Sequence, residues 1–386
     1  MLLSKKIYNS EVLIINLLIV GFFLLPNLGE ILPFLFIFFL YDIKNYKFNY
    51  SVIIYLFLLF SFCLYVFIAD WQKGAGIEVI GRLLYPILFF LVGFIFFKKY
   101  GEILSANLKL NSAISFFVFC VLSISYTLLN FGSYSDFSVD NGRVVYEYIT
   151  GVKYSNTLIN GFLCSSMVLF PLYILKDNTL SKGKNIFIFS ISVISIYMGI
   201  LLGNRSTFVI LLFVFLLLIL TSKFNLWKLS LIILGSVLYY LLYFSNSTLG
   251  KRMSSDDGLD NSRLRNWLEG IDIIAKNPLL GSDLRTKDVF AHNLFLDIAI
   301  PYGIFPMLIL FFMYFLAISI FIKFVFIKRK TFFSLYFMSL FIGINLIFFI
   351  EPAYQGLFKL FCFYCLILGM GFSYFSKKEK ISSVKI

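Results

Sequence analysis

The sequence predicts an all-α, polytopic membrane protein, and three observations lead to this fold class. Of the 386 residues, 60% are hydrophobic and only 14% are charged, and the mean hydropathy is +0.91. Soluble domains are about 45–50% apolar and about 25% charged. Apolar runs of roughly 20 residues, the length that crosses a bilayer as a helix, recur along the chain. We therefore expect one transmembrane domain over residues 1–386 rather than several soluble domains.

About twelve transmembrane helices are predicted. The apolar runs lie near residues 12–28, 30–41, 51–69, 81–97, 111–130, 154–175, 185–202, 206–221, 226–244, 303–326, 331–350 and 355–375. The first two are short and nearly contiguous, which also fits one hairpin whose second leg is incomplete. When the spans alternate, the two long connections, residues 131–153 and 245–302, fall on the same side of the membrane.

The distribution of charge orients these spans. With the N-terminus inside, the inner segments carry twenty basic and five acidic residues, whereas the outer segments carry thirteen basic and fifteen acidic residues. Inner loops rich in Lys and Arg are the expected pattern for membrane proteins. The net charge of +13 is therefore explained by topology, and we expect no nucleic acid as a partner. Both termini are predicted to be cytoplasmic, and both long loops are predicted to be outside.

Arginine is concentrated on the predicted outer side. Seven of the eight arginines fall there, whereas the inner charges are almost all lysine. Either residue would satisfy topology, but the planar guanidinium binds phosphate and carboxylate in a bidentate manner. This bias indicates an anionic ligand at the outer face. The alternative is that each outer arginine pairs with one of the fifteen outer acids.

The second long loop, residues 245–302, is predicted to contain an amphipathic helix at residues 262–276. Its apolar residues recur at helical spacing, and its charged residues form i,i+4 pairs on the opposite side. The apolar stripe consists of Leu264, Trp267, Leu268, Ile271, Ile274 and Ala275. Asn277-Pro278 is predicted to end the helix. Such a helix lies either on the outer membrane surface or on the helical bundle.

Two single residues stand out as candidates for chemistry. His292 is the only histidine, and it precedes an apolar run broken by Pro301 and Gly303. Its imidazole is able to accept a proton near neutral pH, although a lone interfacial histidine often has only a structural role. Arg205 lies between two apolar runs with almost no loop around it. A permanent charge at the edge of the membrane usually marks a functional site.

Three sequence blocks around these residues resemble the family of O-antigen ligases and O-antigen polymerases, which are membrane glycosyltransferases. The first is Gly203-Asn204-Arg205-Ser206, and the third is His292-Asn293-x9-Gly303. The second is an Arg-x3-Trp helix, Arg263 to Trp267, that closes with Asn277-Pro278-Leu279-Leu280-Gly281. The resemblance covers about residues 150–350. Pro306, where ligases often have a second glycine, departs from the family pattern.

The resemblance implies a GT-C-like membrane fold and an inverting glycosyl transfer that uses no cofactor and no metal. Arg205 and Arg263 would bind the diphosphate of an undecaprenyl-diphosphate-linked oligosaccharide, and Arg265 is the alternative to Arg263. His292 would orient or deprotonate the hydroxyl of a glycan acceptor. A second set of residues is expected to support them: Asn204, Asn293, Arg143 and Trp267.

The resemblance leaves the acceptor open. A polymerase would join lipid-linked repeat units, and a chain-length regulator would be a further partner. A ligase would instead move the finished glycan to lipid A–core. The short segment between Gly281 and His292, together with Pro306, favours the polymerase. A flippase for the same lipid-linked units is the rival from another class, but it would need polar residues deep in the spans. The expected location is a bacterial inner membrane with the active site facing the periplasm.

Overall fold

The computed structural model contains helices and no strands among the residues that it describes. These residues are 11–15, 17–19, 21–22, 31–40, 46–74, 76, 79–101, 110, 114, 117–118, 121–122, 125–131, 181–201, 211–213, 216, 262–282, 291, 293–327, 332–350 and 358–382. The chain divides into two compact units, which we describe separately. Unit 1 comprises Met1–Asn111, Leu264–Phe324 and Glu351–Ile386, and unit 2 comprises Ser112–Arg263 and Val325–Ile350.

Four helices of unit 1 carry long apolar segments. They are α3 (Tyr50–Gln72), α4 (Val79–Tyr100), α15 (Ile304–Ile327) and α18 (Phe358–Ser382). Their apolar segments contain 19–23 residues each, which is enough to cross a bilayer. They coincide with four of the predicted spans, so the chain is a helical membrane protein. Several of the twelve predicted spans, such as 154–175 and 226–244, lie outside the described residues.

The predicted span at residues 30–41 does not form one continuous helix. The structure has the 3₁₀-helix η2 (Leu32–Leu35) followed by the single α-helical turn α2 (Phe36–Phe39). Pro33 lies in the first turn of η2 and has no backbone N–H to donate. These eight residues are too short to span a membrane on their own. The neighbouring residues 23–30 and 41–45, on which the hairpin prediction also depends, lie outside the described residues.

Glycine allows α4 and α18 to pack at close range. A Cβ atom on Gly93 would lie 2.1 Å from the backbone oxygen of Leu366, and one on Gly369 would lie 2.1 Å from the backbone oxygen of Phe90. Membrane helices associate through such small residues, because lipid gives no hydrophobic driving force between them. Cys362 and Cys365 are buried free thiols of α18.

Lysines gather at one end of unit 1. Lys98 Nζ donates to the backbone oxygen of Lys47 at 3.2 Å, and Lys99 Nζ pairs with Glu11 Oε2 at 2.6 Å. Partial burial raises the pKa of Glu11. The hydrogen bonds from Lys99 and Tyr100 and the charge of Lys99 lower this pKa by more than burial raises it, so it lies below its usual value. This is the end that the orientation predicted from the sequence places in the cytoplasm.

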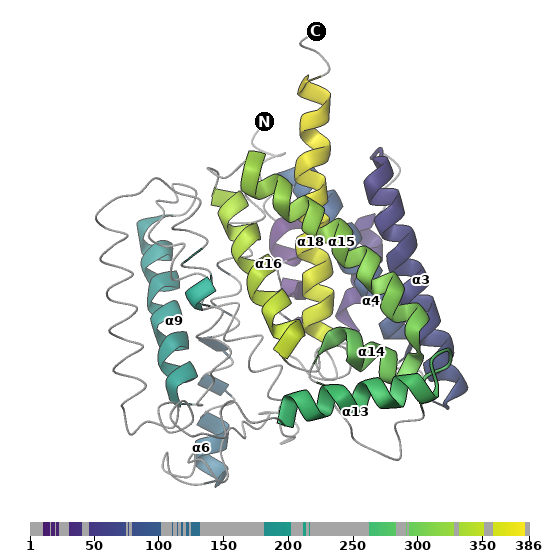
Figure 1. The fold of residues 1–386 in the computed structure, drawn as a ribbon. Coiled ribbons are helices and arrows are strands. Elements are labelled where there is room, and N and C mark those ends of the chain that lie inside the picture. Colours follow the sequence, from purple (N-terminus) through teal and green to yellow (C-terminus); the bar gives the residue numbers. More distant parts are fainter. Residues whose placement is uncertain are drawn as a thin grey trace. The chain divides into compact units, whose positions relative to one another are not determined.

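The opposite end of unit 1 holds the two elements that carry the sequence motifs, α13 (Ser262–Lys276) and α14 (Leu294–Tyr302). The range of α13 is the one predicted for the amphipathic helix. In Figure 1, α13 runs crosswise to the long axes of α3 and α18. α14 ends at Tyr302 and α15 begins at Ile304, so these two helices are a single apolar run broken at Gly303.

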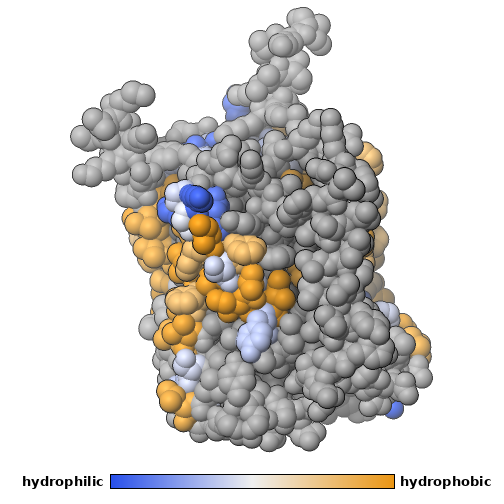
Figure 2. Space-filling view, turned by 90° about the vertical axis from the view of Figure 1, so that its left-hand side faces the viewer, coloured by the Kyte–Doolittle hydropathy of each residue, from blue (hydrophilic) through white to orange (hydrophobic). Residues whose placement is uncertain are grey.

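Unit 2 contains α6 (Ser125–Phe131), α9 (Lys182–Leu201) and α16 (Phe332–Ile350). α9 and α16 fall on two further predicted spans, and α16 carries a shorter apolar segment, Phe333–Phe349. Hydrophobic side chains predominate among the coloured residues in Figure 2. Exposed apolar residues of α9, such as Ile186, Val193 and Tyr197, fit a surface in contact with lipid.

Candidate functional site

The start of α14, where the His292-Asn293 motif lies, is fixed by one buried carboxylate. Asp297 Oδ1 accepts a hydrogen bond from the backbone N–H of Ala291 at 2.8 Å, and its Oδ2 accepts one from the N–H of Asn293 at 3.0 Å. Only 7% of Asp297 is exposed. The residues before and after His292 are thus both bonded to the same side chain in the first turn of α14. His292 itself lies outside the described residues.

Asn293 is the N-cap of α14. Its side-chain oxygen accepts from the N–H groups of Phe295 and Leu296 at 3.1 and 3.4 Å. These two donors have no partner inside the helix, and an asparagine in this place is one of the preferred caps. The structure therefore gives Asn293 a positioning role at the helix start. The Asn of the motif and Asp297 together determine where α14 begins.

The break between α14 and α15 is filled by the turn that follows α13. In an unbroken helix the N–H of Ile304 would bond to the carbonyl of Ile300. Instead, Ile304 N–H donates to the carbonyl of Pro278 at 2.8 Å, and the carbonyl of Ile300 accepts from Ser282 N–H at 2.8 Å. These two backbone groups are therefore satisfied by Pro278 of the Asn-Pro-Leu-Leu-Gly block and by Ser282, which directly follows the block.

Two glycines make this contact possible. Gly281 and Gly303 have φ values of 69° and 84°, which L side chains rarely adopt. A Cβ on Gly281 would lie 2.3 Å from the backbone carbon of Pro301, and one on Gly303 would lie 2.3 Å from the backbone oxygen of Leu279. The glycine of the second sequence block thus packs on the α14 end, and the glycine of the third block packs on the turn. We call this contact the glycine junction.

α13 presents three different faces. Gly270 is buried, and a Cβ there would lie 3.0 Å from Ile300 Cδ1 and 3.6 Å from Ala291 Cβ, so this face packs on α14. The predicted apolar stripe lies beside this face and is largely exposed, with Trp267 at 37% and Leu268 at 60%. α13 therefore contacts α14 through the face that contains Gly270 and not through the apolar stripe. Gly270 has no side chain, so the two helices approach most closely there.

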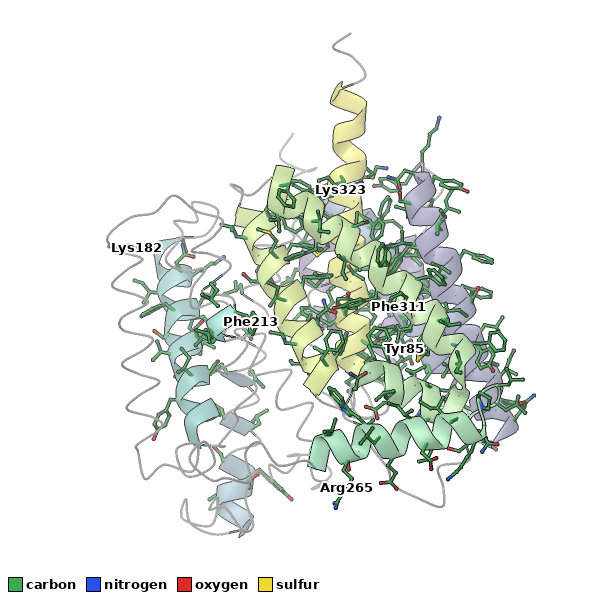
Figure 3. The ribbon with its side chains drawn as sticks, viewed as in Figure 1. Tyr85, Lys182, Phe213, Arg265, Phe311 and Lys323 are labelled. Atoms are coloured by element: carbon green, nitrogen blue, oxygen red, sulfur yellow. The ribbon has the colours of Figure 1, made fainter. Side chains whose placement is uncertain are left out.

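The charged face of α13 contains Arg265, which is exposed. Figure 3 shows its side chain pointing away from the helices of unit 1. Arg263 lies in the first turn of the same helix. The remaining candidates, Asn204, Arg205 and Arg143, lie outside the described residues, as does most of the predicted loop at 131–153.

A partly buried polar cluster, which the sequence did not single out, joins α14 to α3 and α4. Asp70 Oδ2 pairs with Arg82 Nη1 at 2.6 Å, and Asp70 Oδ1 accepts from the hydroxyl of Tyr302 at 2.9 Å. Lys73 Nζ donates to the carbonyl of Pro301 at 2.6 Å and lies 5.5 Å from the centre of the Tyr302 ring. We call these four residues the Asp70 cluster. It holds the end of α14 against the connection between α3 and α4.

The Asp70 cluster has a structural role. Burial, together with the charge of Asp70, raises the pKa of Tyr302 far above its ordinary value, so the phenol stays protonated and donates to the carboxylate. Both oxygens of Asp70 have a donor, and the carbonyl of Pro301, which the helix break releases, has Lys73. Sequence signals for it exist, since Asp70 and Arg82 are charges at the facing ends of two apolar runs.

Replacing Asp70 with asparagine is expected to destabilise the protein by about 1–3 kcal/mol, because Arg82 loses the charge of its partner in a mostly buried place. The measurement is the thermal unfolding midpoint of the purified protein in detergent.

Asp272→Asn is the matched control. Its ion pair with Lys276 has the same 2.6 Å distance, but the side chains are 62% and 68% exposed. Exposed i,i+4 pairs contribute about 0.5 kcal/mol or less, so the control midpoint should barely change. Equal shifts in both variants would contradict the assigned role of Asp70.

No protein-family model matches the chain, and no curated protein is significantly similar to it.

Proposed function

We propose that the chain is a membrane glycosyltransferase that acts on glycans linked to a lipid diphosphate, and that it polymerises repeat units of a bacterial surface polysaccharide. The observation that carries this proposal is the series of three sequence blocks around Arg205, Arg263 and His292. The structure brings two of these blocks together: the glycines of the second and third blocks, Gly281 and Gly303, pack on each other's segments across the glycine junction.

The proposed reaction is an inverting substitution at the anomeric carbon of the donor. The acceptor hydroxyl oxygen forms the new bond to this carbon, and the bond to the diphosphate oxygen breaks with its electron pair leaving on the diphosphate. His292 takes the proton of the hydroxyl as general base. Arg205 and Arg263 stabilise the negative charge that develops on the leaving group, and neither needs to change protonation state to do so.

The described part of the structure supports this chemistry through positioning. The backbone on both sides of His292 is bonded to Asp297, and the far end of α14 is held by the glycine junction and by the Asp70 cluster. A general base must be held within hydrogen-bond reach of its substrate, so a helix fixed at both ends suits this role. The charge distribution supports an outward-facing site, because the lysine-rich end of unit 1 is the opposite one.

Deleting the gene in its host separates the polymerase from its closest alternative. Loss of a polymerase should leave single repeat units attached to lipid A–core. Loss of a ligase should leave lipid A–core without glycan and the glycan on its lipid carrier. Accumulation of lipid-linked units on the cytoplasmic side would instead favour a flippase. Unchanged long glycan chains in the deletion strain would contradict all three functions.

A further inference from the structure

Exposed apolar residues of α13 and of the turn that follows it, at the Asp70 end of unit 1, have no role in the proposed reaction. On α13 they form the exposed stripe, where Leu264, Leu268 and Ile271 are each more than half exposed. In the turn after α13, Leu279 is 59% and Leu280 is 80% exposed. This apolar surface differs from the face of α13 that contains Gly270, which is buried against α14.

The turn lies beside the apolar part of α3 and not beyond its end. The hydroxyl of Tyr65 in α3 donates to the carbonyl of Leu279 at 3.1 Å. Tyr65 precedes the last residue of α3, Gln72, by seven positions, which corresponds to about 10 Å along a helix. Helical side chains lean towards the N-terminus of their helix, so the tyrosine reaches away from the Gln72 end. Leu279 and Leu280 are therefore at the depth of a membrane-crossing segment.

Backbone groups beside the turn are hydrogen-bonded within the protein, which is what an apolar environment requires. The non-helical backbone groups next to it pair internally, as Ile304 N–H does with Pro278 and Ser282 N–H does with Ile300. Unpaired polar groups are costly in lipid, so irregular backbone occurs there only when it is satisfied by protein. A turn exposed only to water would not need this pairing.

The charges on α13 argue against attraction by lipid headgroups as the driving force. The face beyond the apolar stripe carries Arg265, Glu269, Asp272 and Lys276, two cations and two anions. Lys276 and Asp272 pair with each other, and both side chains are exposed. A neutral polar face and an apolar stripe are the pattern of a helix that inserts by burying apolar area.

We propose that α13 and the turn after it form a membrane-inserted element, whose apolar surface lies among the acyl chains of the leaflet next to the Gln72 end of α3. The occupant of this surface is phospholipid. Near the same end of α3, Trp71 is also exposed, at 57%. The proposal does not depend on glycosyl transfer, since it concerns only where this element lies.

Spin labels test the proposal in the full-length protein. The five cysteines are first replaced by alanine, and single cysteines are then introduced by Leu268→Cys and Leu280→Cys. Asp272→Cys, on the charged face of the same helix, is the matched control, and Phe312→Cys on an exposed position of α15 is the lipid reference. The labelled proteins are reconstituted into phosphatidylcholine nanodiscs, and collision rates with oxygen and with a water-soluble nickel chelate are measured by electron paramagnetic resonance.

The expected result is a several-fold higher ratio of oxygen to nickel collisions at 268 and 280 than at 272, approaching the ratio at 312. A ratio at 268 and 280 equal to that at 272 would mean that the surface faces water, and the proposal would be wrong. Low collision rates with both reagents would mean that protein covers the surface, either another segment or a second copy, and would also overturn it. Because no activity is measured, the result stands whether or not the chain transfers glycans.

Discussion

Replacing Gly303 with alanine is expected to reduce the folded yield sharply and to lower the free energy of unfolding by about 3–5 kcal/mol. Two effects combine at this position. The φ of 84° is strained for any residue with a Cβ, and the added methyl would lie 2.3 Å from the backbone oxygen of Leu279. Backbone atoms cannot rotate aside, so the turn must move away from α14 and lose its two hydrogen bonds. Fluorescence-detected size exclusion and the thermal unfolding midpoint measure the outcome.

Two other glycines separate the strain from the clash. Gly101 also has a positive φ, 62°, but a Cβ there meets no atom within 4 Å, so Gly101→Ala should cost about 1 kcal/mol. Gly183 has no positive φ and also has open space around it, so Gly183→Ala should be neutral or slightly stabilising. If Gly303→Ala behaved like Gly101→Ala, the close contact at the glycine junction would not be essential to the fold.

His292→Ala, Arg205→Ala and Arg263→Ala are each expected to abolish detectable polymer while the protein remains in the membrane. Loss of a general base lowers the rate roughly 100- to 10,000-fold, and loss of a group that stabilises developing charge costs about 100- to 1,000-fold. Arg205→Lys should also fail, because an ammonium cannot replace a bidentate guanidinium. The measurement is glycan length in membranes that contain equal amounts of each variant.

The control for these variants is Lys276→Ala, which removes an exposed cation of α13 whose ion-pair partner, Asp272, lies on the same helix. It should keep normal chain length. Unchanged polymer in His292→Ala would remove the general-base role and would leave His292 as a structural residue. Activity in Arg205→Lys equal to that of the unchanged protein would show that charge alone is sufficient there.

Local sequence patterns predicted the elements well where the signal is carried by neighbouring residues. The stripe on α13 and the Asn277-Pro278 stop indicated the observed range Ser262–Lys276. Pro301 and Gly303 indicated the break before α15. Four apolar runs gave four helices of membrane-crossing length. In each case the determining residues lie within one or two helical turns of the feature.

Features that depend on distant residues were not predictable in this way. The hydrogen bond between Tyr302 and Asp70 joins residues 232 positions apart, and no periodicity relates them. The face of α13 that meets the bundle is set by Gly270, whose contribution is close approach rather than hydrophobicity. Hydropathy therefore identified the stripe but not the contact. The second and third sequence blocks each end in a glycine. The physical reason for these two glycines is visible only in the structure, where both lie at the glycine junction.

The most direct test of the account is turnover by the purified protein in nanodiscs, supplied with defined undecaprenyl-diphosphate-linked repeat units and no added metal. The account predicts that products grow by whole repeat units, that free undecaprenyl diphosphate appears with each addition, and that His292→Ala stops both. Repeat units that stay single while moving between leaflets, or that are transferred only to added lipid A–core, would contradict the polymerase function.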